Sequence, residues 1–155
     1  MAVGATHTPS GHFASPLHIT IVLPDFYLPT KQARAALPKK VSMKNAVHNI
    51  SRAALVVEAF CSGDLDLLGK VMDDRLHQPY RLRLIPGAAS VMEAAKKAGA
   101  AAVALSGAGP GIIAFSSETG SGIGESMRRA FEFAGLKARI FNLRVSGQGA
   151  EIQIS

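Results

Sequence analysis

The sequence has one cysteine, no tryptophan and only two tyrosines among its 155 residues. The lone cysteine, Cys61, cannot form a disulfide within the chain, so nothing indicates an oxidising compartment. It lies in the apolar run at residues 56–61, which predicts a buried, inert thiol. No apolar run approaches the roughly 18–20 residues of a membrane-spanning helix. The amino terminus also lacks the charged-then-apolar order of a secretion signal, so we expect no membrane partner.

Acidic residues are also scarce, with 11 Asp and Glu against 17 Lys and Arg and a net charge of +6. This balance raises the possibility of a nucleic-acid partner. The basic residues are spread along the chain, with one modest cluster at residues 31–44. No aromatic residue is interleaved within that cluster to stack on bases. We therefore expect no nucleic-acid partner, and a solvated helix face or an anionic substrate explains the cluster equally well.

What the chain does contain is typical of one globular domain, with 48% hydrophobic and 18% charged residues. Residues 1–16 are rich in Gly, Ser, Thr and Pro without periodicity, which predicts a flexible lead-in before a domain at residues 17–155. Apolar alternation and short apolar runs predict strands at residues 17–23, 100–105, 112–115 and 138–145.

Helical spacing and end signals predict five helices between these strands. They begin at Thr30, Ser42, Asp64, Pro86 and Ser121, and they end near Leu37, at Gly63, before Pro79, at Gly99 and at Gly135. The order is strand, helices, strand, turn, strand, helix, strand. That order predicts an α+β fold of the ferredoxin-like, split β-α-β type, with extra helices in the first crossover. We expect an antiparallel sheet with its helices packed on one face.

A glycine-rich turn separates the second and third predicted strands. Gly107, Gly109 and Gly111 allow positive φ angles and close approach of a ligand to the backbone, with Ser106 at the mouth of the turn. The pattern matches neither the dinucleotide fingerprint nor a P-loop, because no helix follows directly and no Gly-Lys-Ser/Thr is present. A plain hairpin turn is the alternative interpretation, although the connection is longer than a simple hairpin needs.

Two further segments carry polar side chains in patterns that suit a ligand. Thr30 and Arg34 lie four residues apart and share one face of a short helix, and an arginine can hold a carboxylate with two parallel hydrogen bonds. A capping threonine and a surface arginine are the alternative. Residues 74–81 gather polar groups, including His77 and Arg81, which a charged helix end also explains. We find no carboxylate at useful spacing from His77, and the five scattered histidines predict no metal site.

These segments together resemble the homoserine kinase family of the GHMP kinase superfamily. The resemblance covers roughly residues 17–155, and the glycine-rich turn alone marks only the superfamily. It rests on four segments: Pro29-Thr30-Lys31-Gln32-Ala33-Arg34-Ala35-Ala36-Leu37-Pro38, Asn49-Ile50-Ser51-Arg52-Ala53-Ala54-Leu55, Asp74-Arg75-Leu76-His77-Gln78-Pro79-Tyr80-Arg81 and Leu105-Ser106-Gly107-Ala108-Gly109-Pro110.

The resemblance implies the carboxyl-terminal, substrate-binding half of an enzyme that transfers the γ-phosphoryl of ATP to the hydroxyl of L-homoserine, on the route to threonine. In the complete enzyme the cofactors are ATP and Mg²⁺. The resemblance places Arg34 and Arg81 on the substrate carboxylate, with Thr30 beside Arg34. It makes Ser106, Gly107 and Gly109 the turn near the reacting phosphate, and it assigns no catalytic residue. It also implies a cytoplasmic location, or the plastid stroma for a plant or algal chain.

The sequence departs from the family in one important respect. It contains no phosphate loop of the Pro-x-x-x-Gly-Leu-Gly-Ser-Ser-Ala type, and residues 1–16 match nothing in the family. We therefore expect little kinase activity from this chain alone, without a missing amino-terminal half, and we expect that half or a homo-oligomer as its partner. Two alternatives stay open. One is a non-catalytic amino-acid-binding module, and the other is an RNA-binding domain, which needs exposed aromatics although Phe115 and Phe141 are expected in the core.

Overall fold

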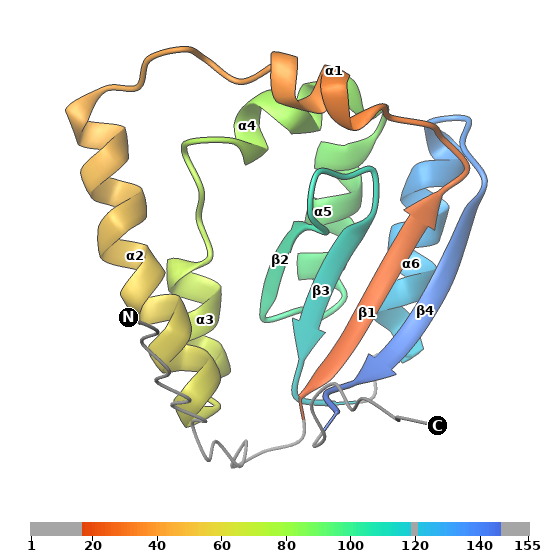
Figure 1. Ribbon diagram of the computed structural model, residues 1–155. Coiled ribbons are helices and arrows are strands. Elements are labelled where there is room, and N and C mark those ends of the chain that lie inside the picture. The colour runs from red at the N-terminus through yellow and green to blue at the C-terminus, as the bar shows by residue number, and fades with distance from the viewer. Residues whose placement is uncertain (1–16, 119–120, 147–155) are drawn as a thin grey trace, which may run out of the picture.

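The structure, a computed structural model, describes residues 17–118 and 121–146 (Figure 1). The predicted lead-in at residues 1–16 lies outside this part of the chain. Four strands form one antiparallel sheet in the order β2-β3-β1-β4. They are β1 (His18–Pro24), β2 (Ala102–Leu105), β3 (Ile112–Ser116) and β4 (Ala138–Arg144). This is the predicted α+β, ferredoxin-like arrangement, which is therefore confirmed.

The helices connect these strands in the two crossovers. The first crossover contains α1 (Thr30–Ala35), α2 (Met43–Ser62), α3 (Leu65–Val71), α4 (Gln78–Arg81), the 3-10 helix η1 (Leu82–Leu84) and α5 (Ala88–Lys97). The second contains α6 (Ser121–Phe133). Among the described helices none is both long and apolar enough to cross a membrane.

Side-chain caps set several of these boundaries as the sequence predicts. The Ser42 hydroxyl accepts a hydrogen bond from the Asn45 amide at the start of α2, and the Asp64 carboxylate accepts one from the Leu67 amide at the start of α3. Gly63 ends α2 with a φ of 73°, a left-handed conformation that glycine adopts without strain.

Two predicted boundaries are wrong, and one short helix was not predicted. Thr30 is the first residue of α1 and makes no capping bond, because Pro29 occupies the cap position. The third helix ends at Val71 instead of continuing toward Pro79. The chain between Val71 and Pro79 turns around the side chain of Asp74 and then enters α4, a four-residue helix that the sequence analysis does not predict.

Helices α5 and α6 pack side by side on one face of the sheet (Figure 1). The core beneath them contains fully buried side chains from both layers, among them Val22, Ile112, Met127 and Phe131. Close approach of α6 depends on Gly124, where a Cβ would lie only 2.7 Å from Cγ2 of Ile140. This helical layer therefore covers one face of the sheet with a closely packed core.

Helices α2 and α3 lie on the other face of the sheet, so the expectation that all helices pack on one face is wrong. A second cluster of buried residues there joins Ala59 and Leu68 to Phe115 of β3. The Phe60 and Phe115 rings meet edge to face, with centroids 5.4 Å apart. This cluster covers the β2–β3 side of the second face and also includes Leu17 and Ile19 at the start of β1.

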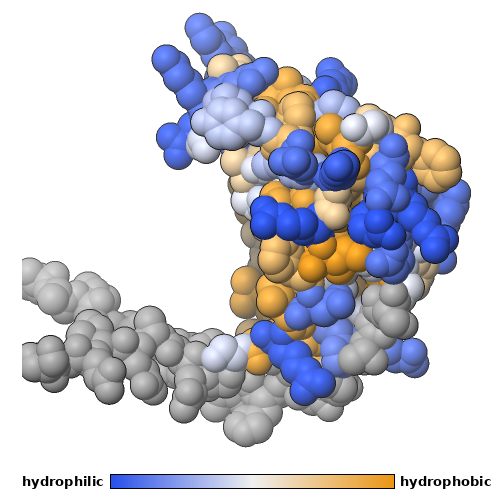
Figure 2. Space-filling model, turned by 90° about the vertical axis from the view of Figure 1, so that its right-hand side faces the viewer, coloured by the Kyte–Doolittle hydropathy of each residue, from blue (hydrophilic) through white to orange (hydrophobic). Residues whose placement is uncertain are grey.

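The β4 side of the same face is open. Phe141 is 39% exposed, so its predicted place in the core is wrong. The Arg139 guanidinium lies 5.8 Å from the centre of its ring. Figure 2, which looks onto this side of the molecule, shows apolar side chains through the middle of the view with charged ones around them.

Helix α2 is unusual because most of its large apolar side chains are exposed. Val47, Ile50 and Val57 are 55%, 72% and 62% exposed, and Ala59 is the buried residue of the helix. Cys61 is also exposed, so the prediction of a buried thiol is wrong. The apolar run around it is a helix whose successive residues face different sides.

Candidate functional site

The three segments singled out in the sequence share one support beneath the glycine-rich turn. A Cβ on Gly109 would lie 2.8 Å from Cδ1 of Ile85 and 3.8 Å from Cδ2 of Leu28. Leu28 lies just before α1 and Ile85 just after η1, and both belong to the main core cluster. Figure 1 shows α1, α4 and the turn between β2 and β3 at the same end of the sheet. The fold therefore brings these segments together.

The glycine-rich turn closes β2 and β3 as a hairpin. The Ser106 amide donates to the Gly111 carbonyl at 2.8 Å, and the Gly109 amide donates to the Ser106 carbonyl at 3.1 Å. Gly107 and Gly109 have φ values of 62° and 84°, a region that strongly favours glycine. Gly107 is exposed, and no side chain would meet a Cβ placed on it. Gly109 is thus packed against core side chains, whereas Gly107 faces open space.

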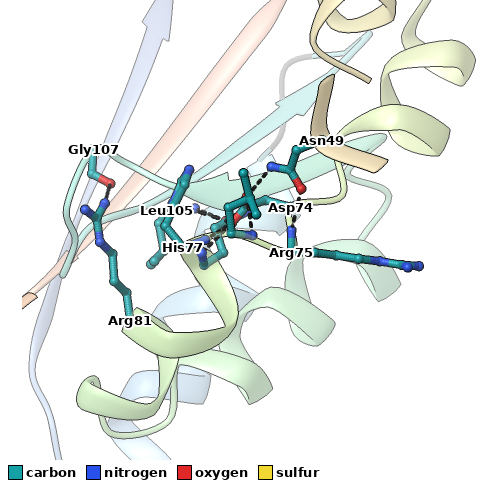
Figure 3. Close-up of polar contacts among 9 residues, drawn as sticks. Asn49, Asp74, Arg75, His77, Arg81, Leu105 and Gly107 are labelled. Carbon is teal, nitrogen blue, oxygen red and sulfur yellow. Dashed lines mark hydrogen bonds and ion pairs between the residues drawn. The ribbon is translucent and has the colours of Figure 1, made fainter. Parts of the chain in front are cut away.

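Arg81, the last residue of α4, contacts this turn. Its Nη1 donates to the Gly107 carbonyl at 3.3 Å (Figure 3). Its Nε is buried and has no hydrogen-bond partner among the described residues. A guanidinium carries five N–H donors, and leaving a buried donor unpaired costs about 1–3 kcal/mol. Arg81 is therefore held against the turn through Nη1, with its buried Nε unpaired among the described residues.

Thr30 and Arg34 lie exposed on α1, where Ala33 provides the buried contact. None of the hydrogen bonds or ion pairs found in residues 17–118 and 121–146 involves either side chain. Both are therefore accessible to a ligand, and their spacing keeps them on one side of the helix. Their role in holding a carboxylate together with Arg81 stays a prediction.

Asp74 is the residue that sequence reasoning missed. Its Oδ1 accepts hydrogen bonds from Asn49 Nδ2 at 2.6 Å and from the Leu76 amide at 3.0 Å. Its Oδ2 accepts from the His77 amide at 2.9 Å and from the Gln78 amide. Figure 3 shows this carboxylate at the centre of the polar contacts. One side chain thus shapes the turn that leads into α4.

Burial raises the pKa of Asp74, but the hydrogen bonds from Gln78, Leu76, Asn49 and His77 outweigh it, so the pKa lies below its ordinary value. The carboxylate is therefore charged near neutral pH. Hydrogen bonds to a charged acceptor are stronger than neutral ones, which suits a residue that holds three backbone amides.

The same network continues on both sides of Asp74. Asn49 of α2 also accepts, through its Oδ1, from the Arg75 amide at 2.9 Å. The buried Gln78 accepts from the Leu105 amide at 2.7 Å, one residue before Ser106. A continuous set of hydrogen bonds therefore joins α2 to α4 and to the glycine-rich turn. The sequence does carry a signal for this arrangement. Proline is favoured in the first turn of a helix, and an aspartate shortly before Pro79 is typical of the turn that precedes such a helix.

His77 has a carboxylate partner that the sequence analysis did not expect. Its Nδ1 lies 3.5 Å from Oδ2 of Asp74, three residues earlier, and its side chain is 46% exposed. A second histidine, His48, lies 2.9 Å from Oδ2 of Asp73. No group of three or more His, Cys, Asp or Glu side chains in the described residues is arranged to hold a metal ion.

A cavity of about 340 Å³ lies between α3, α5 and β2. Its lining includes Asp74, Gln78 and Lys96, but it contains neither Arg81 nor any part of the glycine-rich turn. The predicted site residues therefore lie elsewhere, on the exposed end of the domain. Asp74 and Gln78 line this cavity and also belong to the hydrogen-bond network that reaches Leu105 beside the turn.

Residues 56–133, half of the chain, match the family described as GHMP kinases C terminal. The chain belongs to the GHMP kinases. Within them it is similar to the homoserine kinase of Moorella thermoacetica, with 47% identity over 86% of this chain and 46% of that protein. It is 43% identical to the homoserine kinase of Pyrococcus furiosus, over 86% of this chain and 45% of that protein.

The crystal structure of homoserine kinase from Cytophaga hutchinsonii superimposes on this GHMP kinase domain with a TM-score of 0.82 at 33% identity. The superposition covers 86% of this chain and 43% of that one. The chain therefore spans about half the length of the relatives it matches. The part it matches is the one that the family description calls C terminal.

Proposed function

We propose that this chain is the substrate-binding half of a homoserine kinase, which phosphorylates the hydroxyl of L-homoserine with ATP in threonine biosynthesis in the cytoplasm. The observation that carries the proposal is the contact between Arg81 and the Gly107 carbonyl. It joins an arginine with unpaired donors to the glycine-rich turn of a GHMP kinase domain. The names and sequences of the relatives support homoserine as the substrate.

In this proposal Arg34 and Arg81 bind the carboxylate of homoserine, and Thr30 lies beside Arg34. The substrate hydroxyl then points toward the turn at Ser106, Gly107 and Gly109. Its oxygen attacks the γ-phosphorus of ATP and releases its proton to solvent, the bond to the β,γ-bridging oxygen breaks, and ADP leaves. The turn lies beside the transferred phosphoryl, and the arginines fix the distance between the two reactants. Positioning of this kind accounts for much of the catalysis in phosphoryl transfer.

ATP and Mg²⁺ in this proposal are held by an amino-terminal half. The sequence contains no phosphate loop of the superfamily type, and the described residues offer no set of three acidic or histidine side chains for a metal. Magnesium would neutralise the charge of the phosphates. We therefore expect the 155-residue chain alone to bind homoserine and not to phosphorylate it.

Calorimetric titration of the purified chain with L-homoserine tests the binding half of the proposal. An arginine–carboxylate pair contributes roughly 1.5–3 kcal/mol, so Arg34→Ala and Arg81→Ala should each raise the Kd about tenfold or more. Arg83→Ala is the matched control, because Arg83 is an exposed arginine two residues from Arg81. Circular dichroism verifies that each variant is folded.

A ligand without the carboxylate sharpens the test. 3-Amino-1-propanol keeps the amine and the hydroxyl, so its weaker binding should be unaffected by either arginine substitution. Equal effects of the arginine variants on both ligands, or no homoserine binding at all, would contradict the assignment of the site.

A coupled assay for ADP release tests the catalytic half. We expect no turnover from the chain alone, and turnover when the amino-terminal half of the Moorella enzyme is added. Robust turnover by the chain alone would refute its dependence on a partner. Homoserine binding without turnover in the mixture would instead favour a non-catalytic amino-acid-binding module.

A further inference from the structure

The side chain of Gln78 links α4 to the strand that enters the glycine-rich turn. Gln78 is the first residue of α4 and is 9% exposed. Its Oε1 accepts a hydrogen bond of 2.7 Å from the amide of Leu105, the last residue of β2. Its own backbone amide donates to Oδ2 of Asp74. Gln78 therefore joins the Asp74 turn, α4 and β2 at one buried position.

The Leu105 amide depends on this side chain for its partner. β2 lies at the edge of the described sheet and pairs there with β3. The next amide, that of Ser106, points toward β3 and donates to the Gly111 carbonyl. Successive amides of a strand point in opposite directions, so the Leu105 amide points outward, toward α4. Because a buried amide without a partner is unfavourable, Gln78 satisfies a donor that strand pairing leaves over.

Two contacts hold the two ends of α4 against the turn. The first residue, Gln78, is bonded to Leu105, and the last, Arg81, is bonded to Gly107. Figure 3 shows Leu105 beside the start of this helix and Gly107 beside its end. The Arg81 contact is 3.3 Å long, beyond the usual range of an N–H···O bond, so it is the weaker of the two. A four-residue helix is not stable by itself, so its place beside the turn depends on the Gln78 bond.

We propose that Gln78 is a positioning residue for substrate binding, because its bond to the Leu105 amide holds Arg81 beside the glycine-rich turn. This inference rests on the proposed function, in which Arg81 binds the carboxylate of homoserine. Gln78 acts through Arg81 and does not touch the substrate. The position requires an uncharged acceptor, because a carboxylate there would be buried next to the charged Asp74. An apolar side chain would leave the Leu105 amide unpaired.

Nuclear magnetic resonance of the free chain tests the position of Arg81 without any ligand. Gln78→Met keeps the length of the side chain and removes the acceptor. The buried Nε–H of Arg81 should then exchange with solvent about fivefold faster or more, and the Leu105 amide should also exchange faster. Arg83 is an exposed arginine of the same segment, and its Nε–H is the internal control that should not change.

Calorimetric titration of a double-variant cycle tests whether Gln78 acts through Arg81. Gln78→Met should raise the Kd for homoserine about three- to tenfold, less than Arg81→Ala does. In the Arg81→Ala background the same substitution should change the Kd by less than about twofold, because the group that it positions is gone. The Kd for 3-amino-1-propanol, which has no carboxylate, should not change.

A variant with a remote packing defect separates positioning from a general loss of stability. Ile123 lies on α6 and is 3% exposed. Ile123→Val removes one buried methyl group and should lower the melting temperature. It should change neither the Arg81 Nε–H exchange nor the Kd for homoserine. If Ile123→Val reproduces the effects of Gln78→Met, loss of stability explains both and the proposal falls.

Homoserine should in turn slow exchange of the Leu105 amide in the wild type, because coupling between two positions is reciprocal. This measurement needs no variant, so it decides the matter even if Gln78→Met does not fold. The proposal is overturned if homoserine binds and leaves the Leu105 amide unchanged, or if Gln78→Met leaves the Arg81 Nε–H unchanged. It is also overturned if Gln78→Met weakens homoserine binding equally with and without Arg81. Absence of homoserine binding would instead contradict the proposed function, and the ligand-free measurement distinguishes the two failures.

Discussion

Replacing Asp74 by asparagine should destabilise the domain far more than such a conservative change normally does. Asparagine has the shape of aspartate but only one oxygen, and each Asp74 oxygen accepts two hydrogen bonds. Whichever way the amide turns, its NH₂ group faces two N–H donors that it cannot accept. The variant therefore loses half of the network and adds a repulsion, although its volume is unchanged.

The magnitude follows from the donors left unpaired. An unpaired buried donor costs about 1–3 kcal/mol, and two such donors near a side chain that is 12% exposed give an expected loss of roughly 2–4 kcal/mol after partial access of water is allowed for. Asp73→Asn is the matched control. Asp73 is 56% exposed, so its ion pairs with His48 and Arg75 should contribute at most about 1 kcal/mol.

Urea denaturation at neutral pH, followed by circular dichroism, measures both losses. The midpoint for Asp74→Asn should fall well below that for Asp73→Asn, with unchanged slopes. If the two variants unfold at the same midpoint, or if the Asp73 variant is the less stable one, Asp74 does not organise this part of the fold. The Leu76 and His77 amides should also exchange faster with solvent in the Asp74 variant.

Other predictions concern pH and packing. Because the pKa of folded Asp74 lies below its ordinary 3.8, its contribution is complete above that pH and is lost as pH falls through the folded value. Acid titrations of urea stability should show this loss in the wild type, and Asp74→Asn should lack it. Gly109→Ala combines a φ of 84° with a 2.8 Å approach to Ile85, so its melting temperature should fall further than that of Gly107→Ala, which meets no neighbour and costs about 1–2 kcal/mol. Phe131→Ala, at a fully buried position, should cost about 3–5 kcal/mol; a loss below about 1 kcal/mol would contradict its place in the core.

Local signals in the sequence predicted most of the elements. The alternating run in β1 and the caps at Ser42 and Asp64 depend on neighbours within a few residues, which a sequence displays directly. α4 depends instead on Asp74, which holds the chain in a turn with help from Asn49 on a distant helix. Contacts between residues so far apart in the chain have little effect on the local sequence pattern from which helices are predicted.

Periodicity predicted α2 but not which of its faces would be packed. Apolar residues occur on both sides of this helix, so Val47 and Ile50 were as plausible in the core as Ala59. In the candidate site, too, the sequence indicated the residues but not their contacts. Residue types indicated Arg81 and the glycine-rich turn, whereas their contact at Gly107 follows from strand pairing and helix placement that no local window contains.

The position of β1 in the sheet has a consequence for how the chain acquires its structure during synthesis. Of the four strands in this sheet β1 is the first to leave the ribosome, yet it pairs on both sides with strands made much later, β3 and β4. The Thr20 hydroxyl donates a hydrogen bond to Asn142, which is synthesised 122 positions later. The nascent polypeptide therefore cannot complete its sheet until nearly all of the described residues have emerged, and an apolar segment stays without its partners throughout that interval.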